Sequence, residues 1–374
     1  MKFSKSLFLA FAGLGLFACS NEEVVTEGGN IQGMGVVEVT VKSSSTRSVQ
    51  DAATGNTVVV GGNITVEVYS GNSLQKSATI NRSTPDTDGE ESYTVQIFGV
   101  NNPDKVIAYC NDGKNVNDDA DIAITDTRLQ STPATIPAYA EAALSAADIN
   151  GEMENSEDGQ VYKRYTKSLA LEIPVARLEL DGVKHKAHDT GNTAEPSCKF
   201  GTLKINGVYL NNIYATKDAA SATNTYSWNE TSTLGTGNFP ILYDVIGEFN
   251  VGEDFLAAGA TFPETDGDAF AYNFFAGTGK ALPELKIYFN EATANADGDP
   301  VTSPRYAVVK SYKDSYGGPI NEFVPGHIYR ITNVELMDKY IGPNEGGETV
   351  YGVEVTVTEA TWTVVDTTAD WVEQ

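Results

Sequence analysis

Two stretches of the chain alternate valine with polar residues: Gly35-Val36-Val37-Glu38-Val39-Thr40-Val41-Lys42 near the start, and Tyr351-Gly352-Val353-Glu354-Val355-Thr356-Val357-Thr358 near the end. A strict period of two predicts a β-strand that buries one face. Val37, Val39 and Val41 share that face in the first stretch. In the second, the same spacing aligns Val353, Val355 and Val357, with Tyr351 extending the face. The two segments are therefore expected to fit similar pockets.

The alternation changes phase near the end of the chain. After Thr358 and Glu359 the apolar positions become Ala360, Trp362 and Val364, shifted by one residue relative to Val357. A straight strand would turn these residues onto its other face, so the shift requires a bulge or a bend. We predict two C-terminal strand elements with a break near Glu359.

Composition favours an all-β protein of two domains. The chain has 374 residues with 35 glycines and 10% aromatic residues, and its valine-, threonine- and tyrosine-rich runs are separated by Asn/Asp/Gly clusters. That length and pattern predict two β-sandwiches in tandem. The formal net charge of −26 argues against nucleic acid and against an anionic membrane surface as partners, because both repel a polyanion.

The first residues have the pattern of an export signal. Lys2 and Lys5 precede an apolar run over 7–17, which is too short for a membrane-spanning helix of about 20 residues. Leu16 and Ala18 before Cys19 resemble a bacterial lipobox, in which the cysteine is acylated and becomes the mature N-terminus. We expect a signal peptide at 1–18 and lipidation of Cys19. An ordinary signal peptide that is cut elsewhere is the alternative.

Two segments in the middle of the chain shape the expected domain boundary. The alanine-rich stretch 138–147 is expected to be a helix or an irregular loop, and the acidic stretch 150–159 is the best candidate for a linker. We therefore predict an N-terminal domain at 48–160 and a C-terminal domain at 161–374.

Catalytic and metal-binding patterns are weak, and we expect neither an enzyme nor a cofactor. His185 and His188 lie three residues apart, with Cys198 further on, which imitates a metal cluster, but their lysine-rich surroundings favour solvated side chains. Cys110 and Cys198 could pair in an oxidising compartment, although two separate thiols are the simpler expectation. The sequences Asp266-Gly267-Asp268 and Asp297-Gly298-Asp299 lack the ligand spacing of a calcium loop. No metal site is predicted.

The order of these segments resembles the fimbrillins, or type V pilins, of Bacteroides-type bacteria. The resemblance covers nearly the whole chain. It is carried by the lipobox, by the acidic segment 20–23 that is similar to a surface-export tag, and by the valine strand that ends before Arg47. It continues with Ile64-Thr65-Val66-Glu67-Val68-Tyr69, Val106-Ile107-Ala108-Tyr109-Cys110-Asn111, Ile173-Pro174-Val175-Ala176-Arg177-Leu178, Pro325-Gly326-His327-Ile328-Tyr329-Arg330-Ile331 and the C-terminal pair of strands.

The resemblance implies two transthyretin-like β-sandwich domains and a defined maturation. An arginine-specific protease would cut between Arg47 and Ser48 and remove the lipidated propeptide 19–47 with its first strand, Val37, Val39 and Val41 included. The C-terminal segment 350–374 of a neighbouring subunit would then fill the groove. Arg82 and Arg128 are alternative cleavage positions.

The resemblance also implies partners and a location. The partners would be further pilin subunits in a head-to-tail homopolymer, anchor and tip subunits, the processing protease, and a ligand on a host or bacterial surface. The precursor would be an outer-membrane lipoprotein, and the mature form would lie on the cell surface in fimbriae used for adhesion. The competing hypothesis is a surface lipoprotein that binds glycans or adheres as a monomer, with a flat platform of exposed aromatic residues.

Overall fold

The computed structural model describes the chain in fifteen segments: 34–42, 62–81, 92–130, 135–180, 183–185, 200–223, 242–245, 255–257, 261–262, 270–294, 304–331, 334–336, 340–343, 353–356 and 358–361. The regular secondary structure of these residues is almost entirely β-strand, with one short α-helix, α1 (Gly113–Asp118), and a 3-10 turn, η2 (Ala146–Asp148). The predicted all-β class is confirmed.

The first half of the molecule contains two four-stranded sheets, with strand orders β4-β1-β8-β7 and β3-β2-β5-β6. Apolar residues at alternating positions of β1, β2 and β5 belong to one buried cluster, so the inner faces of these sheets form the core. The strands are β1 (Met34–Lys42), β2 (Ile64–Ser70), β3 (Ser73–Ile80), β4 (Ser92–Asn101), β5 (Lys105–Cys110), β6 (Ala138–Ala143), β7 (Ile149–Glu154) and β8 (Val161–Ala170).

The second half contains an eight-stranded sheet built on β12-β11-β16-β17-β18, to which β13, β21 and β22 add, a four-stranded sheet β15-β9-β19-β23, and a small sheet β14-β10-β20. Its strands are β9 (Ala176–Leu180), β10 (Val183–His185), β11 (Phe200–Asn211), β12 (Tyr243–Val245), β13 (Phe255–Ala257), β14 (Thr261–Phe262), β15 (Phe270–Phe274), β16 (Glu284–Ala294), β17 (Arg305–Lys313), β18 (Pro319–Ile320), β19 (His327–Ile331), β20 (Val334–Leu336), β21 (Ile341–Gly342), β22 (Val353–Thr356) and β23 (Thr358–Thr361).

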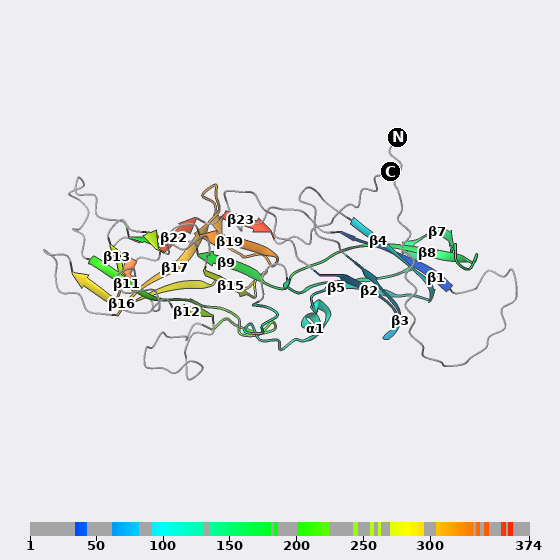
Figure 1. Ribbon diagram of the computed structural model, residues 1–374, viewed down its shortest axis with the longest axis horizontal. Coiled ribbons are helices and arrows are strands. Elements are labelled where there is room, and N and C mark those ends of the chain that lie inside the picture. Colours follow the sequence, from blue (N-terminus) through cyan, green and yellow to red (C-terminus); the bar gives the residue numbers. More distant parts are fainter. Residues whose placement is uncertain are drawn as a thin grey trace.

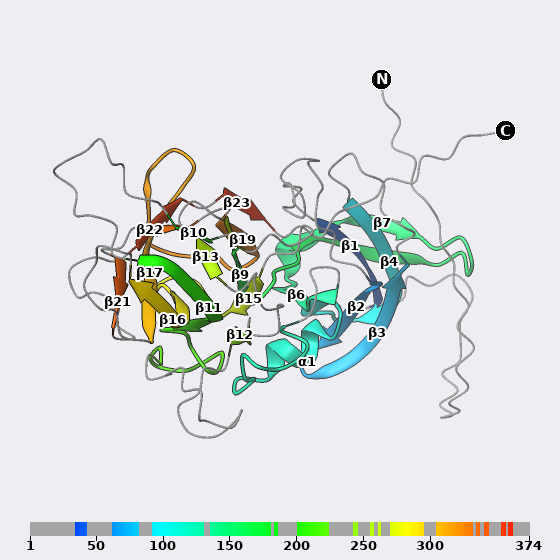
Figure 2. The same ribbon diagram turned by 60° about the vertical axis from the view of Figure 1, so that its left-hand side comes forward.

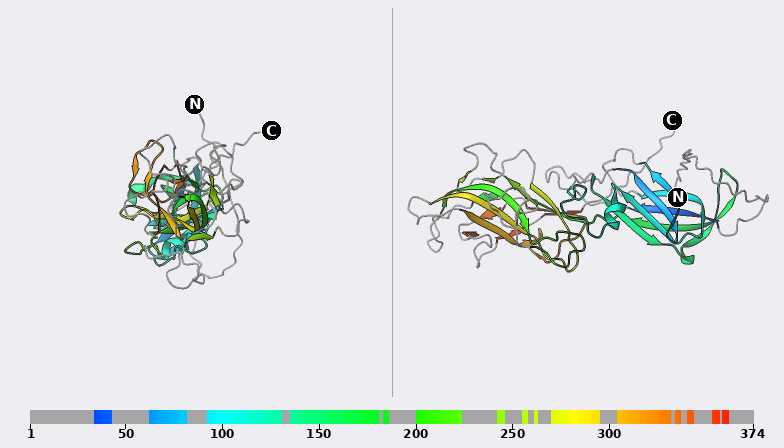
Figure 3. Two further views of the ribbon diagram at one scale, coloured as in Figure 1. Left: turned by 90° about the vertical axis from the view of Figure 1, so that its left-hand side faces the viewer. Right: turned by 90° about the horizontal axis from the view of Figure 1, so that it is seen from below.

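No sheet in the described part of the chain mixes strands from before and after residues 171–175. The two groups of sheets lie end to end along the long axis (Figures 1 and 3). The segment after α1 joins them, because Ile124 N donates to Ala215 O at 2.8 Å and Asn273 Nδ2 donates to Leu129 O at 2.7 Å. The buried cluster consequently runs through both halves.

Two expectations for the middle of the chain are wrong. The alanine-rich stretch is strand β6, which pairs with β5 from Cys110↔Ala138 to Lys105↔Ala143. The acidic stretch at 150–159 is not a linker but belongs to β7 and the turn into β8. Its polarity reflects a largely exposed strand at the edge of a sheet. The sheets change over between Ala170 and Ala176, further along the chain than the predicted boundary at 160/161.

Candidate assembly site

Strand β1 lies inside its sheet, bonded along both edges (Figure 2). It runs antiparallel to β4, from Met34↔Asn101 to Lys42↔Ser92, with one register shift after Gly35. On the other side it runs parallel to β8, from Gly35↔Lys163 to Lys42↔Ala170. Since each edge carries a ladder of backbone hydrogen bonds, loss of β1 would leave two facing rows of unpaired N–H and C=O groups.

The inner face of β1 is apolar and fully buried. Val37, Val39 and Val41 each have 0% of their surface exposed and belong to the main hydrophobic cluster. Burial of one valine side chain is worth about 1.5–3 kcal/mol. The three valines therefore hold β1 strongly in its sheet, and removal of the strand would open an apolar groove.

The outer face of β1 carries a polar contact that valine alternation alone does not reveal. Arg164 Nη2 on β8 donates to Glu38 Oε1, and Gln96 Nε2 on β4 donates to Glu38 Oε2 at 2.8 Å. The side chains of Glu38 and Arg164 are 14% and 30% exposed. One residue pair further on, the hydroxyl oxygens of Thr40 and Thr94 lie 3.1 Å apart. The glutamate thus joins both neighbouring strands across the outside of the sheet.

Gly35 marks where the groove becomes too narrow for a side chain. A Cβ atom at this position would lie 2.9 Å from the ring of Tyr165 and 3.0 Å from the carbonyl oxygen of Lys163. These distances are shorter than ordinary van der Waals contact. A strand in this place is therefore best accommodated with glycine beside the ring of Tyr165.

The C-terminal strands are placed differently. Strand β22 pairs in parallel with β17, from Val309↔Val353 to Lys313↔Thr356, and β23 pairs antiparallel with β19, from His327↔Thr361 to Arg330↔Thr358. Among the described strands each has this one partner, so both are edge strands. The expected pair of C-terminal elements is present, with the change falling between Thr356 and Thr358, slightly before Glu359.

Several predicted site residues lie outside the described segments: Cys19, Arg47, Ser48, Tyr351, Val357, Trp362 and Val364. Val353 and Val355 lie in β22, and Val37, Val39 and Val41 in β1. Lipidation, cleavage and strand exchange at these residues stay predictions. The contact of Glu38 with Arg164 and Gln96 was not predicted, since the only signal in the sequence is a single acid among the valines.

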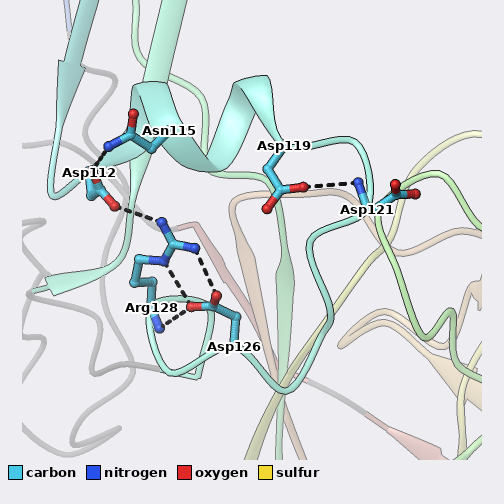
Figure 4. A network of polar contacts seen from close by, with 6 residues as sticks. All are labelled: Asp112, Asn115, Asp119, Asp121, Asp126 and Arg128. Atoms are coloured by element: carbon cyan, nitrogen blue, oxygen red, sulfur yellow. Dashed lines mark hydrogen bonds and ion pairs between the residues drawn. The ribbon is translucent and has the colours of Figure 1, made fainter.

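Arg128, one of the alternative cleavage positions, is held in place on both sides (Figure 4). Its guanidinium donates to Asp126 at 2.9 and 2.8 Å and to Asp112 at 2.7 Å, and its backbone N–H donates to Asp126 Oδ1 at 2.9 Å. The hydrogen bonds from Arg128 lower the pKa of Asp126 to about 2. The next residue, Leu129, is fully buried. The peptide bond after Arg128 is therefore poorly placed to enter a protease active site.

The described part of the chain offers little support for a metal site or for a membrane-spanning helix. No group of three or more His, Cys, Asp or Glu residues there could hold a metal ion. His185 lies in β10, while His188 and Cys198 fall outside the described residues. Cys110, the last residue of β5, is buried. The described residues include no helix long and apolar enough to cross a membrane.

A flat aromatic platform is also missing from the described surface. The large apolar side chains exposed there are scattered, and Tyr316, 97% exposed at a turn, is the aromatic one. The three tryptophans, Trp228, Trp362 and Trp371, lie outside the described residues.

Solved structures with a similar chain trace are fimbrial and adhesion proteins. A protein from Bacteroides eggerthii, provisionally described as a cell adhesion protein, matches with 14% identity and a TM-score of 0.49 over 91% of this chain and 100% of that chain. A fimbrilin from Porphyromonas gingivalis matches with 13% identity and a TM-score of 0.46 over 90% and 99%. The tip fimbrial protein Mfa3 from Porphyromonas gingivalis, with a C-terminal truncation, matches with 9% identity and a TM-score of 0.36 over 88% and 100%.

No protein-family model and no curated protein matches the sequence. We therefore take the function of this chain from its own terminal strands.

Proposed function

We propose that this chain is a structural pilin, a stalk subunit of surface fimbriae that polymerises by strand exchange. It would be exported as a lipoprotein acylated on Cys19 and cut between Arg47 and Ser48 by an arginine-specific protease. The cut would release the anchored segment with β1, and the C-terminal strands of a neighbouring subunit would take its place. The fibre would then serve adhesion at the cell surface.

One observation carries the proposal: among the described strands, the one nearest the N-terminus is internal to its sheet, whereas the two nearest the C-terminus are at edges. An internal strand cannot leave without splitting β4 from β8. The vacated gap exposes unpaired backbone groups on both sides and an apolar floor, and an inserted strand satisfies both. An edge strand can leave while the rest of its sheet stays paired. The chain therefore has an acceptor at one end and a donor at the other.

The geometry of this exchange favours filaments. The acceptor lies in the first half of the molecule and the donor strands lie in the second half, at different places along the long axis (Figure 1). The contact between two subunits would use different surfaces on each, and such a head-to-tail contact does not close on itself. We therefore expect linear polymers.

The position of the proposed cut follows from the same arrangement. Residues 43–47, Ser43-Ser44-Ser45-Thr46-Arg47, directly follow β1, so a cut after Arg47 would separate the strand from everything that remains. Small polar loop residues are the usual sites of proteolysis. By contrast, Arg128 is fixed by two carboxylates and followed by a buried leucine.

The test is limited digestion of the lipid-free precursor, beginning at Ser20, with an arginine-specific protease. The product is analysed by N-terminal sequencing, which locates the cut, and by denaturing gels without boiling and electron microscopy, which detect polymers. We expect a new N-terminus at Ser48 together with ladders or filaments. The Arg47→Ala variant is the matched control and should stay uncut and monomeric. Clean cleavage at Arg47 with a product that remains monomeric would contradict the proposal.

A further inference from the structure

The central sequence of β1 occurs a second time near the C-terminus of this chain. Val37-Glu38-Val39-Thr40-Val41 in β1 and Val353-Glu354-Val355-Thr356-Val357 at the C-terminus are the same five residues in the same order. Both copies also occur as partners in parallel ladders, since β1 pairs in parallel with β8 and the described part of the second copy, β22, with β17. The match includes the polar positions as well as the valines.

Valines alone cannot fix how a donor strand sits in the groove. Because side chains alternate with a period of two, sliding the strand by two residues keeps valines on the buried face. With Val353 in the place of Val39, the floor would take Tyr351, Val353 and Val355, which are all apolar. The opposite slide would put Glu359 in the place of Val41, so the floor itself disfavours it. The first slide must be excluded by something on the outer face.

Arg164 distinguishes between these registers of the donor strand. In the precursor its guanidinium donates to Glu38, which also accepts a hydrogen bond from Gln96 on the opposite side of the gap. When β1 leaves, this partly buried arginine loses its carboxylate. A donor that slides by two residues would place Gly352 or Thr356 where Glu38 had been, and neither carries a charge. One register restores the carboxylate.

Resting on the proposed function, we infer that Arg164 is the specificity determinant of strand exchange, and that it accepts a second copy of this chain by binding Glu354 in the place of Glu38. Thr356 then lies beside Thr94 as Thr40 does, and Val353, Val355 and Val357 replace Val37, Val39 and Val41. Tyr351 would fall at the place of Gly35, where a Cβ atom would crowd the ring of Tyr165 and the carbonyl oxygen of Lys163. The donor therefore leaves the groove at Gly352.

The experiment measures binding of a fluorescent peptide with the sequence of residues 351–361 to cleaved subunits that lack residues 350–374. Peptides with Glu354→Lys and, as the matched control, Glu359→Lys carry the same charge change five residues apart. We expect Glu354→Lys to weaken binding tenfold or more, in the range for one partner of a desolvated charge pair. Glu359→Lys should change it less than threefold. The Arg164→Glu subunit should bind the Glu354→Lys peptide better than the unchanged peptide.

The outcomes separate this inference from the proposed function. If the unchanged peptide does not bind, strand exchange itself is wrong, and the inference falls with it. If the unchanged peptide binds and the two lysine peptides bind equally well, the inference is overturned while strand exchange stands. Should Arg164→Glu fail to fold, Arg164→Gln replaces it. With that subunit the unchanged and Glu354→Gln peptides should bind alike, and a remaining preference for the glutamate would overturn the inference.

Discussion

The N-terminal and C-terminal strands have nearly the same sequence pattern but opposite positions in the fold. Strand β1 is bonded on both sides, and its valines are fully buried. Strands β22 and β23 each have one partner among the described strands and belong to different sheets. The difference teaches that alternation predicts a strand but not how costly its removal is. That cost depends on whether the strand is internal or at an edge.

Loss of the donor should have the largest effect. Deletion of residues 350–374 removes β22 and β23 but leaves the remaining pairing of β17 and β19 intact. We expect the uncut variant to unfold cooperatively and the cleaved variant to form no ladders or filaments in gels and electron micrographs. Polymers formed as readily as by the full chain would show that the donor lies elsewhere.

Matched valine substitutions in β1 and β22 should distinguish the roles of the two strands. Val39→Ala leaves a cavity between the sheets and should lower the free energy of unfolding of the precursor by about 2 kcal/mol. The cleaved polymer should be unaffected, because residue 39 has been removed. Val355→Ala should weaken the polymer instead, while the precursor changes less than it does with Val39→Ala. Denaturant titration of precursor and polymer measures both, and equal losses in both forms would contradict the assignment.

Release of Arg128 should reveal a second cleavage position. Asp126→Ala removes the carboxylate that holds its guanidinium and backbone N–H. We expect slow additional cleavage after Arg128, detected by N-terminal sequencing at Leu129. Since the pKa of Asp126 is lowered to about 2, this protection is complete above the ordinary aspartate pKa of 3.8 and is lost as the pH falls toward 2. At neutral pH the unchanged protein should not be cut after Arg128, and Ser315→Ala, in a distant turn, should behave in the same way.

The smallest effect is expected at Thr40. Its hydroxyl contacts Thr94 on the exposed side of the sheet, and valine keeps the branched shape that suits a strand. Thr40→Val should change the free energy of unfolding of the precursor by less than about 0.5 kcal/mol. A loss as large as that of Val39→Ala would mean that the outer face, not the valine floor, holds β1.

Part of this arrangement could be predicted from the sequence, because side-chain periodicity is local. Alternation located β1, and the phase shift after Val357 predicted two C-terminal strands. Stretch 138–147 was misread because alanine prefers helices, yet Ala138 and Ala140 are buried at alternating positions of β6. The Glu38–Arg164 contact spans 126 positions and depends on the parallel pairing of β1 with β8, which no local pattern encodes.

The most direct measurement is a disulfide trap between subunits, made in a background with Cys110→Ala and Cys198→Ala. Thr94→Cys lies beside the groove, and under strand exchange Thr356→Cys on the donor would take the place of Thr40, whose hydroxyl oxygen lies 3.1 Å from that of Thr94. After cleavage at Arg47, non-reducing gels should show covalent ladders that disappear on reduction and are missing from Thr94→Cys alone. Cleaved subunits that stay monomeric, with no disulfide between chains, would contradict strand exchange.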